Sequence, residues 1–128
     1  MRKYALERDL QKAVVAYLED REATVGDITF LHIPNEGKRT ALQGYRAKRQ
    51  GLRPGAPDLI VWASFYDEDE IEHPITYQIE LKSMTGRQST AQEAFEVRLL
   101  NVGHTYDLVT GVKTEAEAVE AVEAIIDG

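Results

Sequence analysis

The four consecutive apolar residues at positions 59–62 constrain the fold more than any other segment of the chain. A strand with one exposed face alternates apolar and polar residues, whereas a continuous apolar run is typical of a strand that is covered on both faces. Pro57 and Asp58 stand directly before the run. We therefore expect a central strand in a sheet that is flanked by helices, with Asp58 at its start.

A second strand is predicted at residues 77–82, where apolar and polar residues alternate. Because side chains on a strand point alternately to its two faces, Glu80 and Lys82 are expected on the same face. The acidic residues at 67–72 favour a solvated loop, since crowded like charges repel one another. The two strands can therefore pair as an antiparallel hairpin, in which the side chain of Asp58 can converge with those of Glu80 and Lys82.

Apolar spacing and turn residues predict the other elements. Helices are expected at 5–19, 40–50, 89–100 and from 114 onward, and strands at 28–33 and 106–110. Ser89 with Gln92, and Thr114 with Glu117, form capping-box patterns at the starts of the last two helices. The sequence thus predicts an α/β fold with a mixed sheet, in the order helix, strand, helix, strand, strand, helix, strand, helix. The length is that of one domain, spanning residues 1–128.

The absence of cysteine excludes disulfides and cysteine-ligated metal, and it is compatible with a reducing compartment. The longest apolar run, at residues 59–63, is too short to span a bilayer, and the N-terminus shows no targeting segment. We therefore expect a cytoplasmic protein without a membrane partner.

Charge is unevenly distributed along the chain. The formal net charge is −7, but residues 38–53 contain six basic residues and no acidic residue, which leaves −13 for the remainder. Such a segment can attract a phosphate backbone, or it can be the solvated face of a helix, and charge alone favours neither. The basic residues are Lys38, Arg39, Arg46, Lys48, Arg49 and Arg53.

Asp58, Glu80 and Lys82 are the candidate catalytic residues. Two carboxylates at neighbouring strand ends offer hard oxygen ligands to Mg²⁺ or Mn²⁺. Such an ion acidifies bound water and neutralises charge on a phosphate, while Lys82 can orient the nucleophile or stabilise the transition state. On an ordinary surface Glu80 and Lys82 would form only an ion pair. The conjunction of Pro-Asp, a buried strand, a Glu-x-Lys strand and a helix has the layout of the PD-(D/E)xK nucleases.

Within that superfamily the sequence resembles the VRR-NUC branch, the virus-type replication and repair nucleases. The resemblance lies in Glu7 with Gln11, and in residues 32–40, 48–62, 79–92 and 103–109. It implies a restriction-endonuclease-like core, with Glu7, Asp58 and Glu80 around Mg²⁺ or Mn²⁺ and with Lys82 and Gln92 completing the site. Small stand-alone members are similar to phage and prophage proteins that resolve four-way DNA junctions, which implies the same activity in a bacterial or phage-infected cell.

Several other residues have both a functional and a structural interpretation. Asn35, Lys38 and Arg39 lie in a turn that could hold phosphate, although simple turn chemistry would also explain them. Gln92 could reach a metal-bound water or could only cap its helix. The three histidines, His32, His73 and His104, lack the spacing of a zinc site, so we expect packed or exposed imidazoles rather than ligands. Trp62 and the tyrosines lack the clustering of a base-stacking platform, so we expect core or edge packing for most of them.

The sequence therefore predicts a metal-dependent, structure-specific DNA endonuclease that cleaves branched DNA, most simply four-way (Holliday) junctions. Paired incisions in such a junction require two active sites, which a homodimer would supply. The alternatives are a flap-directed, nick-directed or sequence-specific nuclease, and a catalytically silent nucleic-acid-binding module with the same fold.

Overall fold

The computed structural model describes residues 3–34, 40–51 and 53–128, and these contain four helices and four strands in the predicted order. The elements are α1 (Glu7–Thr24), β1 (Thr29–His32), α2 (Ala41–Arg49), β2 (Leu59–Tyr66), β3 (Glu72–Leu81), α3 (Thr90–Asn101), β4 (Asp107–Val109) and α4 (Glu115–Asp127). The predicted α/β fold class is confirmed. The first helix is longer than expected, since it continues to Thr24 rather than ending near residue 19.

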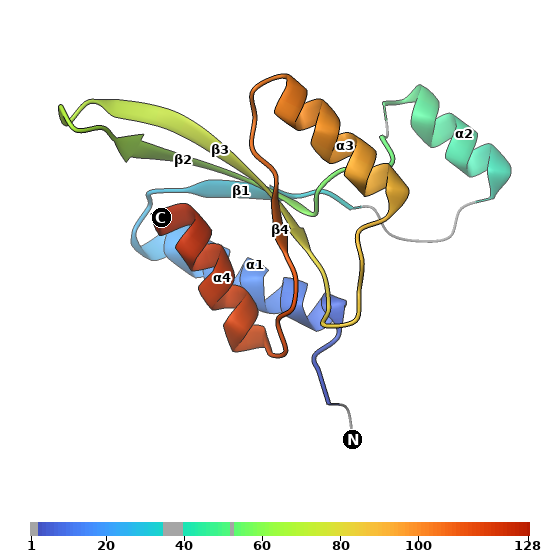
Figure 1. Ribbon diagram of the computed structural model, residues 1–128, viewed down its shortest axis with the longest axis horizontal. Coiled ribbons are helices and arrows are strands. Elements are labelled where there is room, and N and C mark those ends of the chain that lie inside the picture. The colour runs from blue at the N-terminus through green and yellow to red at the C-terminus, as the bar shows by residue number, and fades with distance from the viewer. Residues whose placement is uncertain (1–2, 35–39, 52) are drawn as a thin grey trace.

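The strands form one mixed sheet in the order β1-β2-β3-β4 (Figure 1). β1 and β2 pair antiparallel, β2 and β3 pair antiparallel, and β3 and β4 pair parallel. The prediction that the apolar run at 59–62 lies in a central strand is therefore confirmed. The register pairs Leu59 with Ile79, so Asp58, one residue before β2, lies beside Glu80 of β3.

The hairpin of β2 and β3 is longer than the sequence indicated. Glu72 belongs to β3, so the loop is shorter than the predicted 67–72. The side chain of Asp67 also organises this loop, because its Oδ1 accepts hydrogen bonds from the main-chain nitrogens of Asp69, at 2.8 Å, and Ile71, at 3.0 Å. The expectation that both faces of residues 59–62 are covered is wrong for Trp62, which is 42% exposed.

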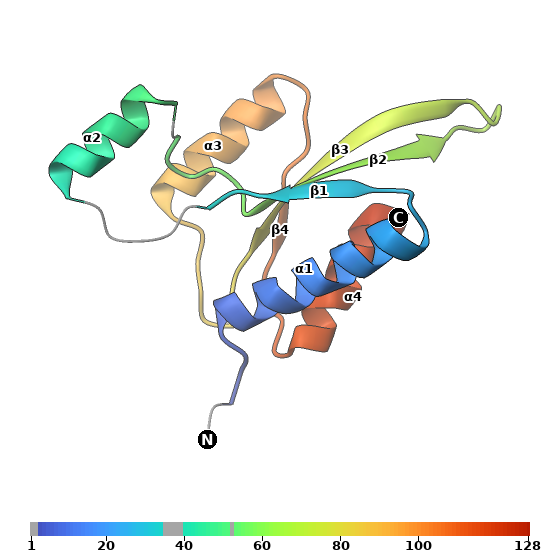
Figure 2. The same ribbon diagram turned by 180° about the vertical axis from the view of Figure 1, so that it is seen from behind.

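One face of the sheet carries the hydrophobic core. Figures 1 and 2 show α1 and α4 side by side against this face, while α3 lies on the other side of the sheet. An apolar residue at every third or fourth position of α1 turns toward the strands, because 3.6 residues complete one helical turn. The buried residues of this cluster are Leu10, Val14, Leu18, Ile28, Leu59, Val61, Ile79, Leu81, Val109, Val112, Ala118 and Val122.

The predicted capping box is complete at the start of α3 and half formed at the start of α4. Ser89 and Gln92 make both hydrogen bonds of a capping box at the start of α3. At the start of α4, the hydroxyl of Thr114 accepts from the nitrogen of Glu117, but the Glu117 carboxylate accepts from the nitrogen of Lys113 instead of Thr114. The second capping box is therefore incomplete, because the preceding residue supplies the closer donor.

Among the described residues, no helix combines the length and the apolar character that crossing a bilayer requires.

Replacing Leu18 with alanine should lower the free energy of unfolding by about 2–5 kcal/mol, because the side chain is fully buried against the sheet and its removal leaves a cavity. Leu42→Ala is the matched control, since Leu42 is 56% exposed and should change stability by less than about 0.5 kcal/mol. Urea unfolding of both variants measures the difference. Equal effects would contradict the position of the core.

Candidate functional site

Asp58, Glu80 and Lys82 lie together where β2 begins and β3 ends. The Oδ2 atom of Asp58 accepts a hydrogen bond of 2.8 Å from the main-chain nitrogen of Leu81. The ammonium of Lys82 lies 3.9 Å from Oε1 of Glu80. The structure thus brings together the three side chains that strand alternation and hairpin pairing placed on one face.

Glu80 is a buried carboxylic acid, with only 1% of its surface exposed. Burial, followed by the charges of Asp58 and Glu7, raises the pKa of Glu80 to about 8, while Lys82 and a backbone hydrogen bond at Asp58 oppose the shift. Burial also raises the pKa of Asp58, against the Leu81 N–H, Lys82 and His32, which favour its ionised form. Two carboxyl groups therefore lie close together, and the charge of Asp58 makes ionisation of Glu80 less favourable, whereas Glu80 favours the ionised form of Asp58.

Gln92 of α3 completes this arrangement from the other side. Its side-chain oxygen accepts from the nitrogen of Ser89, and its Nε2 donates a hydrogen bond to Oε1 of Glu80. One glutamine thus caps its helix and contacts the central carboxylate. The cap that the sequence predicted is present, and the role of Gln92 toward a metal-bound water stays a prediction.

Gly55 fixes the position of α3 against the turn before Asp58. Its φ is +83°, and a Cβ added there would lie 2.1 Å from the main-chain oxygen of Ala91 and 2.7 Å from the nitrogen of Gln92. These are backbone atoms of the first turn of α3, which cannot move away without moving the helix. The sequence indicated only a turn at this glycine, because the contact joins segments that are distant in the chain.

Two further polar residues line the buried side of the site, and the sequence did not single them out. Gln78 lies two residues before Glu80 on β3, and Tyr106 immediately precedes β4, the parallel neighbour of β3. Both side chains are buried, and Gln78 Oε1 has no hydrogen-bond partner among the described residues. Burial and the charge of Glu80 raise the pKa of Tyr106, and the nearby side chain of Gln88 opposes the shift.

Glu7 and Gln11 approach the site from α1. Glu7 is the first residue of that helix and is partly buried, and its charge acts on Glu80. The amide nitrogen of Gln11 lies 3.0 Å from Nδ1 of His32, and this same ring nitrogen lies 3.1 Å from the main-chain oxygen of Asp58. His32 is thus a packed imidazole, as expected, and it supports the strand that carries Asp58.

The donor set suits a divalent cation held by two carboxylates. Asp58 and Glu80 offer hard oxygen atoms, and Glu80 Oε2 is buried without a hydrogen-bond partner among the described residues. A cation would favour the ionised forms of both groups, whose pKa values are raised mainly by burial. Within residues 3–34, 40–51 and 53–128, no three acidic or histidine side chains are grouped as a metal site, so Glu7, Asp58 and Glu80 are not assembled as a three-ligand set.

Four of the basic residues predicted to bind DNA fall within the described residues. Arg46, Lys48 and Arg49 are exposed on α2, and Arg53 is exposed in the turn that follows. Between described residues, none of these four forms an ion pair. Asn35, Lys38 and Arg39 fall outside the described residues.

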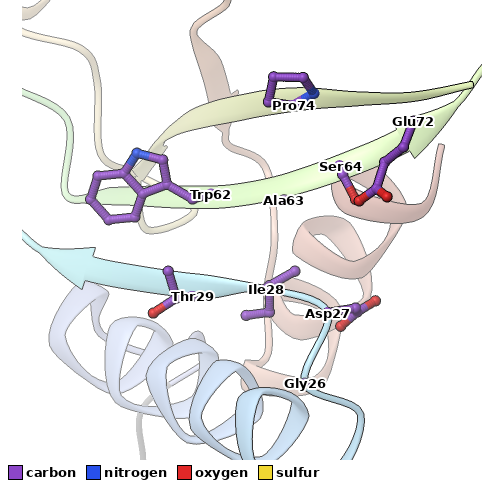
Figure 3. Close-up of a pocket in the computed structure, with 9 residues that line it drawn as sticks. All are labelled: Gly26, Asp27, Ile28, Thr29, Trp62, Ala63, Ser64, Glu72 and Pro74. Atoms are coloured by element: carbon purple, nitrogen blue, oxygen red, sulfur yellow. The ribbon is translucent and has the colours of Figure 1, made fainter.

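A separate hollow of about 610 Å³ lies between the α1–β1 turn and the hairpin (Figure 3). Its lining includes Trp62, Ile28 and the acidic residues Asp27 and Glu72. Asp27 already pairs with Arg21, at 2.7 Å. The hollow contains none of the residues that converge around Glu80, so it is not the candidate site.

Comparison with known proteins finds the same architecture in a solved structure. A protein described as a "VRR_NUC domain protein" superposes with a TM-score of 0.64 over 98% of this chain and 91% of that chain, at 19% sequence identity. No protein-family model matches the sequence, and no curated protein matches it. The chain therefore has a VRR-NUC-like fold. The fold expected from the sequence resemblance is confirmed.

Glu80→Gln should stabilise the protein in EDTA at neutral and alkaline pH. The raised pKa means that the folded protein binds this proton more tightly than the unfolded chain, whose carboxyl titrates near 4.5. The stabilisation that this proton provides is fully present below pH 4.5 and is lost as the pH rises toward 8. At higher pH the wild-type carboxyl carries a buried charge, which glutamine avoids. At pH 8 to 9 we expect a gain of at least about 1 kcal/mol in the free energy of unfolding, which disappears near pH 4.5.

Glu93→Gln is the control for this measurement, because Glu93 is exposed in the first turn of α3. Urea unfolding across this pH range should show little difference between Glu93→Gln and wild type. A Glu80→Gln variant that is less stable than wild type at pH 9 would show that Glu80 is not a penalised buried carboxyl.

Gly55→Ala should lower stability by about 2 kcal/mol or more, because the new methyl group collides with backbone atoms of α3 and the residue must hold a left-handed φ. Gly103→Ala separates the two causes. Its φ of +87° is almost the same, but nothing lies within 4 Å of its added Cβ. If both substitutions cost the same in urea unfolding, the close approach to α3 is not what requires glycine at position 55.

Proposed function

We propose that this protein is a Mg²⁺- or Mn²⁺-dependent DNA endonuclease that hydrolyses phosphodiester bonds in branched DNA, with four-way junctions as its substrate. The observation that carries the proposal is the convergence of Asp58, Glu80 and Lys82 at the ends of two paired strands. The VRR-NUC-like fold supports the same activity. Structural ion pairs are usually exposed, whereas here a carboxylate with 1% exposure is held beside a second carboxylate.

Asp58 and Glu80 would hold the metal ion, with Glu7 close enough to contribute its charge. The bound ion supplies an acidified water and neutralises charge on the phosphate. The chain positions both ligands before the ion arrives. The Leu81 N–H fixes one oxygen of Asp58, and Gln92 fixes one oxygen of Glu80, so little reorganisation accompanies binding.

Lys82 acts as a hydrogen-bond donor to the substrate in this proposal. Its side chain is 11% exposed and ends near Oε1 of Glu80, so the ammonium lies at the border between the buried carboxylates and solvent. A phosphate oxygen that approaches Glu80 would meet this ammonium, which can orient the attacking water or stabilise charge in the transition state. Gln92 is a positioning residue, because it acts on Glu80 rather than on the substrate.

The basic residues of the chain would bind the sugar-phosphate backbone. Arg46, Lys48 and Arg49 project from α2 and Arg53 follows it, while Asn35, Lys38 and Arg39 precede the helix in the sequence. Each cation that contacts a phosphate releases condensed counterions, so affinity should fall steeply with salt. We further propose a homodimer, because one active site per chain can make the paired incisions of a four-way junction only when two chains act together. The small stand-alone VRR-NUC proteins, which act in bacterial or phage-infected cells, would be its relatives.

Asp58→Ala and Lys82→Ala should each abolish cleavage while leaving DNA binding nearly intact. Removing one preorganised electrostatic group commonly lowers catalytic rates by about 10²- to 10³-fold. The test is a panel of labelled four-way junctions, flaps, nicked duplexes and plain duplexes, assayed with Mg²⁺, with Mn²⁺ and with EDTA. Lys113→Ala is the matched lysine control, because Lys113 is exposed in the β4–α4 connection.

The outcomes of this panel separate the proposed function from its rivals. Metal-dependent junction cleavage that is lost in both variants and kept in Lys113→Ala supports the proposal. Cleavage confined to flaps or nicks would change the substrate, and sequence-dependent cleavage of plain duplex would indicate a restriction-type enzyme. No cleavage by the wild type would identify a silent binding module.

A further inference from the structure

The helix α2 exposes its large side chains. Leu42 and Tyr45 are 56% and 60% exposed, and none of the residues of α2 is fully buried. The half-buried positions are the small residues Gly44 and Ala47. Tyr45 is therefore mostly exposed, as is the helix around it, since a Cβ added at Gly44 would meet no atom within 4 Å.

The outward face of α2 carries an apolar, aromatic and cationic stripe. Leu42, Tyr45 and Arg49 follow one another at three and four residue steps and so share one helix face, and Arg46 lies beside them. The guanidinium of Arg49 lies 6.0 Å from the centre of the Tyr45 ring, within cation–π range. We call Leu42, Tyr45, Arg46 and Arg49 the α2 stripe.

The charge of α2 selects the chemistry of its partner. The helix carries Arg46, Lys48 and Arg49 and no acidic residue, so its partner is expected to be anionic. Two copies of the stripe meeting across a two-fold axis would bring arginines toward arginines, which disfavours self-association through this face. In Figures 1 and 2, α2 lies at one end of the molecule, away from α1 and α4.

We propose that the α2 stripe recognises unstacked bases of branched DNA, with Tyr45 stacking on an exposed base, Leu42 packing beside it, and Arg46 and Arg49 on the flanking phosphates. This inference rests on the proposed function. An intact duplex hides the faces of its bases, whereas branch points and single strands expose them. A helix that bound phosphates alone would gain nothing from an exposed leucine and tyrosine, so the stripe explains how a basic surface can prefer branched DNA over duplex.

The test measures DNA binding by fluorescence anisotropy with the full chain in EDTA, which prevents cleavage. The probes are a four-way junction with unpaired bases at its centre, a single strand, and a duplex of equal length. Tyr45→Ala should weaken binding to the first two by about tenfold and leave duplex binding nearly unchanged, while Tyr45→Phe keeps the ring and the affinity. Leu42→Ser should act in the same direction as Tyr45→Ala.

Lys48→Ala is the control, because Lys48 lies on α2 outside the stripe. This variant should weaken binding to all three probes alike and reduce the slope of log affinity against log salt by about one. Circular dichroism and thermal unfolding verify that each variant folds as the wild type does.

Three results would overturn the inference. One is a loss of duplex binding as large as the loss of junction binding in Tyr45→Ala, and another is no effect on any probe. The third is a change of solution mass in Tyr45→Ala without a change in DNA preference, which would make the stripe a protein interface. These failures are distinct from a failure of the proposed function, since a chain that cuts no substrate can still show a Tyr45-dependent preference for branched DNA.

Discussion

The hydrogen bond from the Leu81 nitrogen to the Asp58 carboxylate joins the start of β2 to the end of β3, and the whole candidate site depends on it. Antiparallel pairing of these strands sets Asp58 beside Glu80, and this bond fixes which oxygen of Asp58 faces the backbone. The other carboxylate oxygens of Asp58 and Glu80 are left for other partners. Without it, the ionised form of Asp58 would lose its backbone donor while remaining beside Glu80, whose ionisation it disfavours.

Apolar packing on the opposite face of the sheet stabilises the strands that carry this site. Leu59, Ile79 and Leu81 alternate with Asp58 and Glu80 along the same two strands, and they are fully buried against α1 and α4. Each strand therefore contributes apolar side chains to the core and polar side chains to the site, as its pleat requires. The polar cluster can persist because the hydrophobic core on the opposite face of the sheet holds these strands in place. Functional sites commonly depend on stability that is supplied elsewhere in the structure.

Sequence reasoning predicted the features that follow from local rules. Strand alternation placed Glu80 and Lys82 on one face, and the capping box located Gln92 at the start of α3. It did not predict the contact of Gly55 with the first turn of α3, because that contact depends on how distant segments meet. The length of the hairpin was also missed, since its acidic residues indicated a loop before the fold showed that Glu72 continues β3.

The fold places an acidic segment and a basic segment of the chain far apart. The tip of the β2–β3 hairpin carries Asp67, Glu68, Asp69 and Glu70, with Glu72 beginning the returning strand. In Figures 1 and 2 this tip and α2 lie at opposite ends of the molecule. A polyanion is therefore repelled at one end and attracted at the other, and the resulting field orients its approach before any contact forms. A protein with a net charge of −7 can therefore still approach DNA by its basic end. Because the field weakens as salt is added, both the orientation of this approach and the affinity should depend on ionic strength.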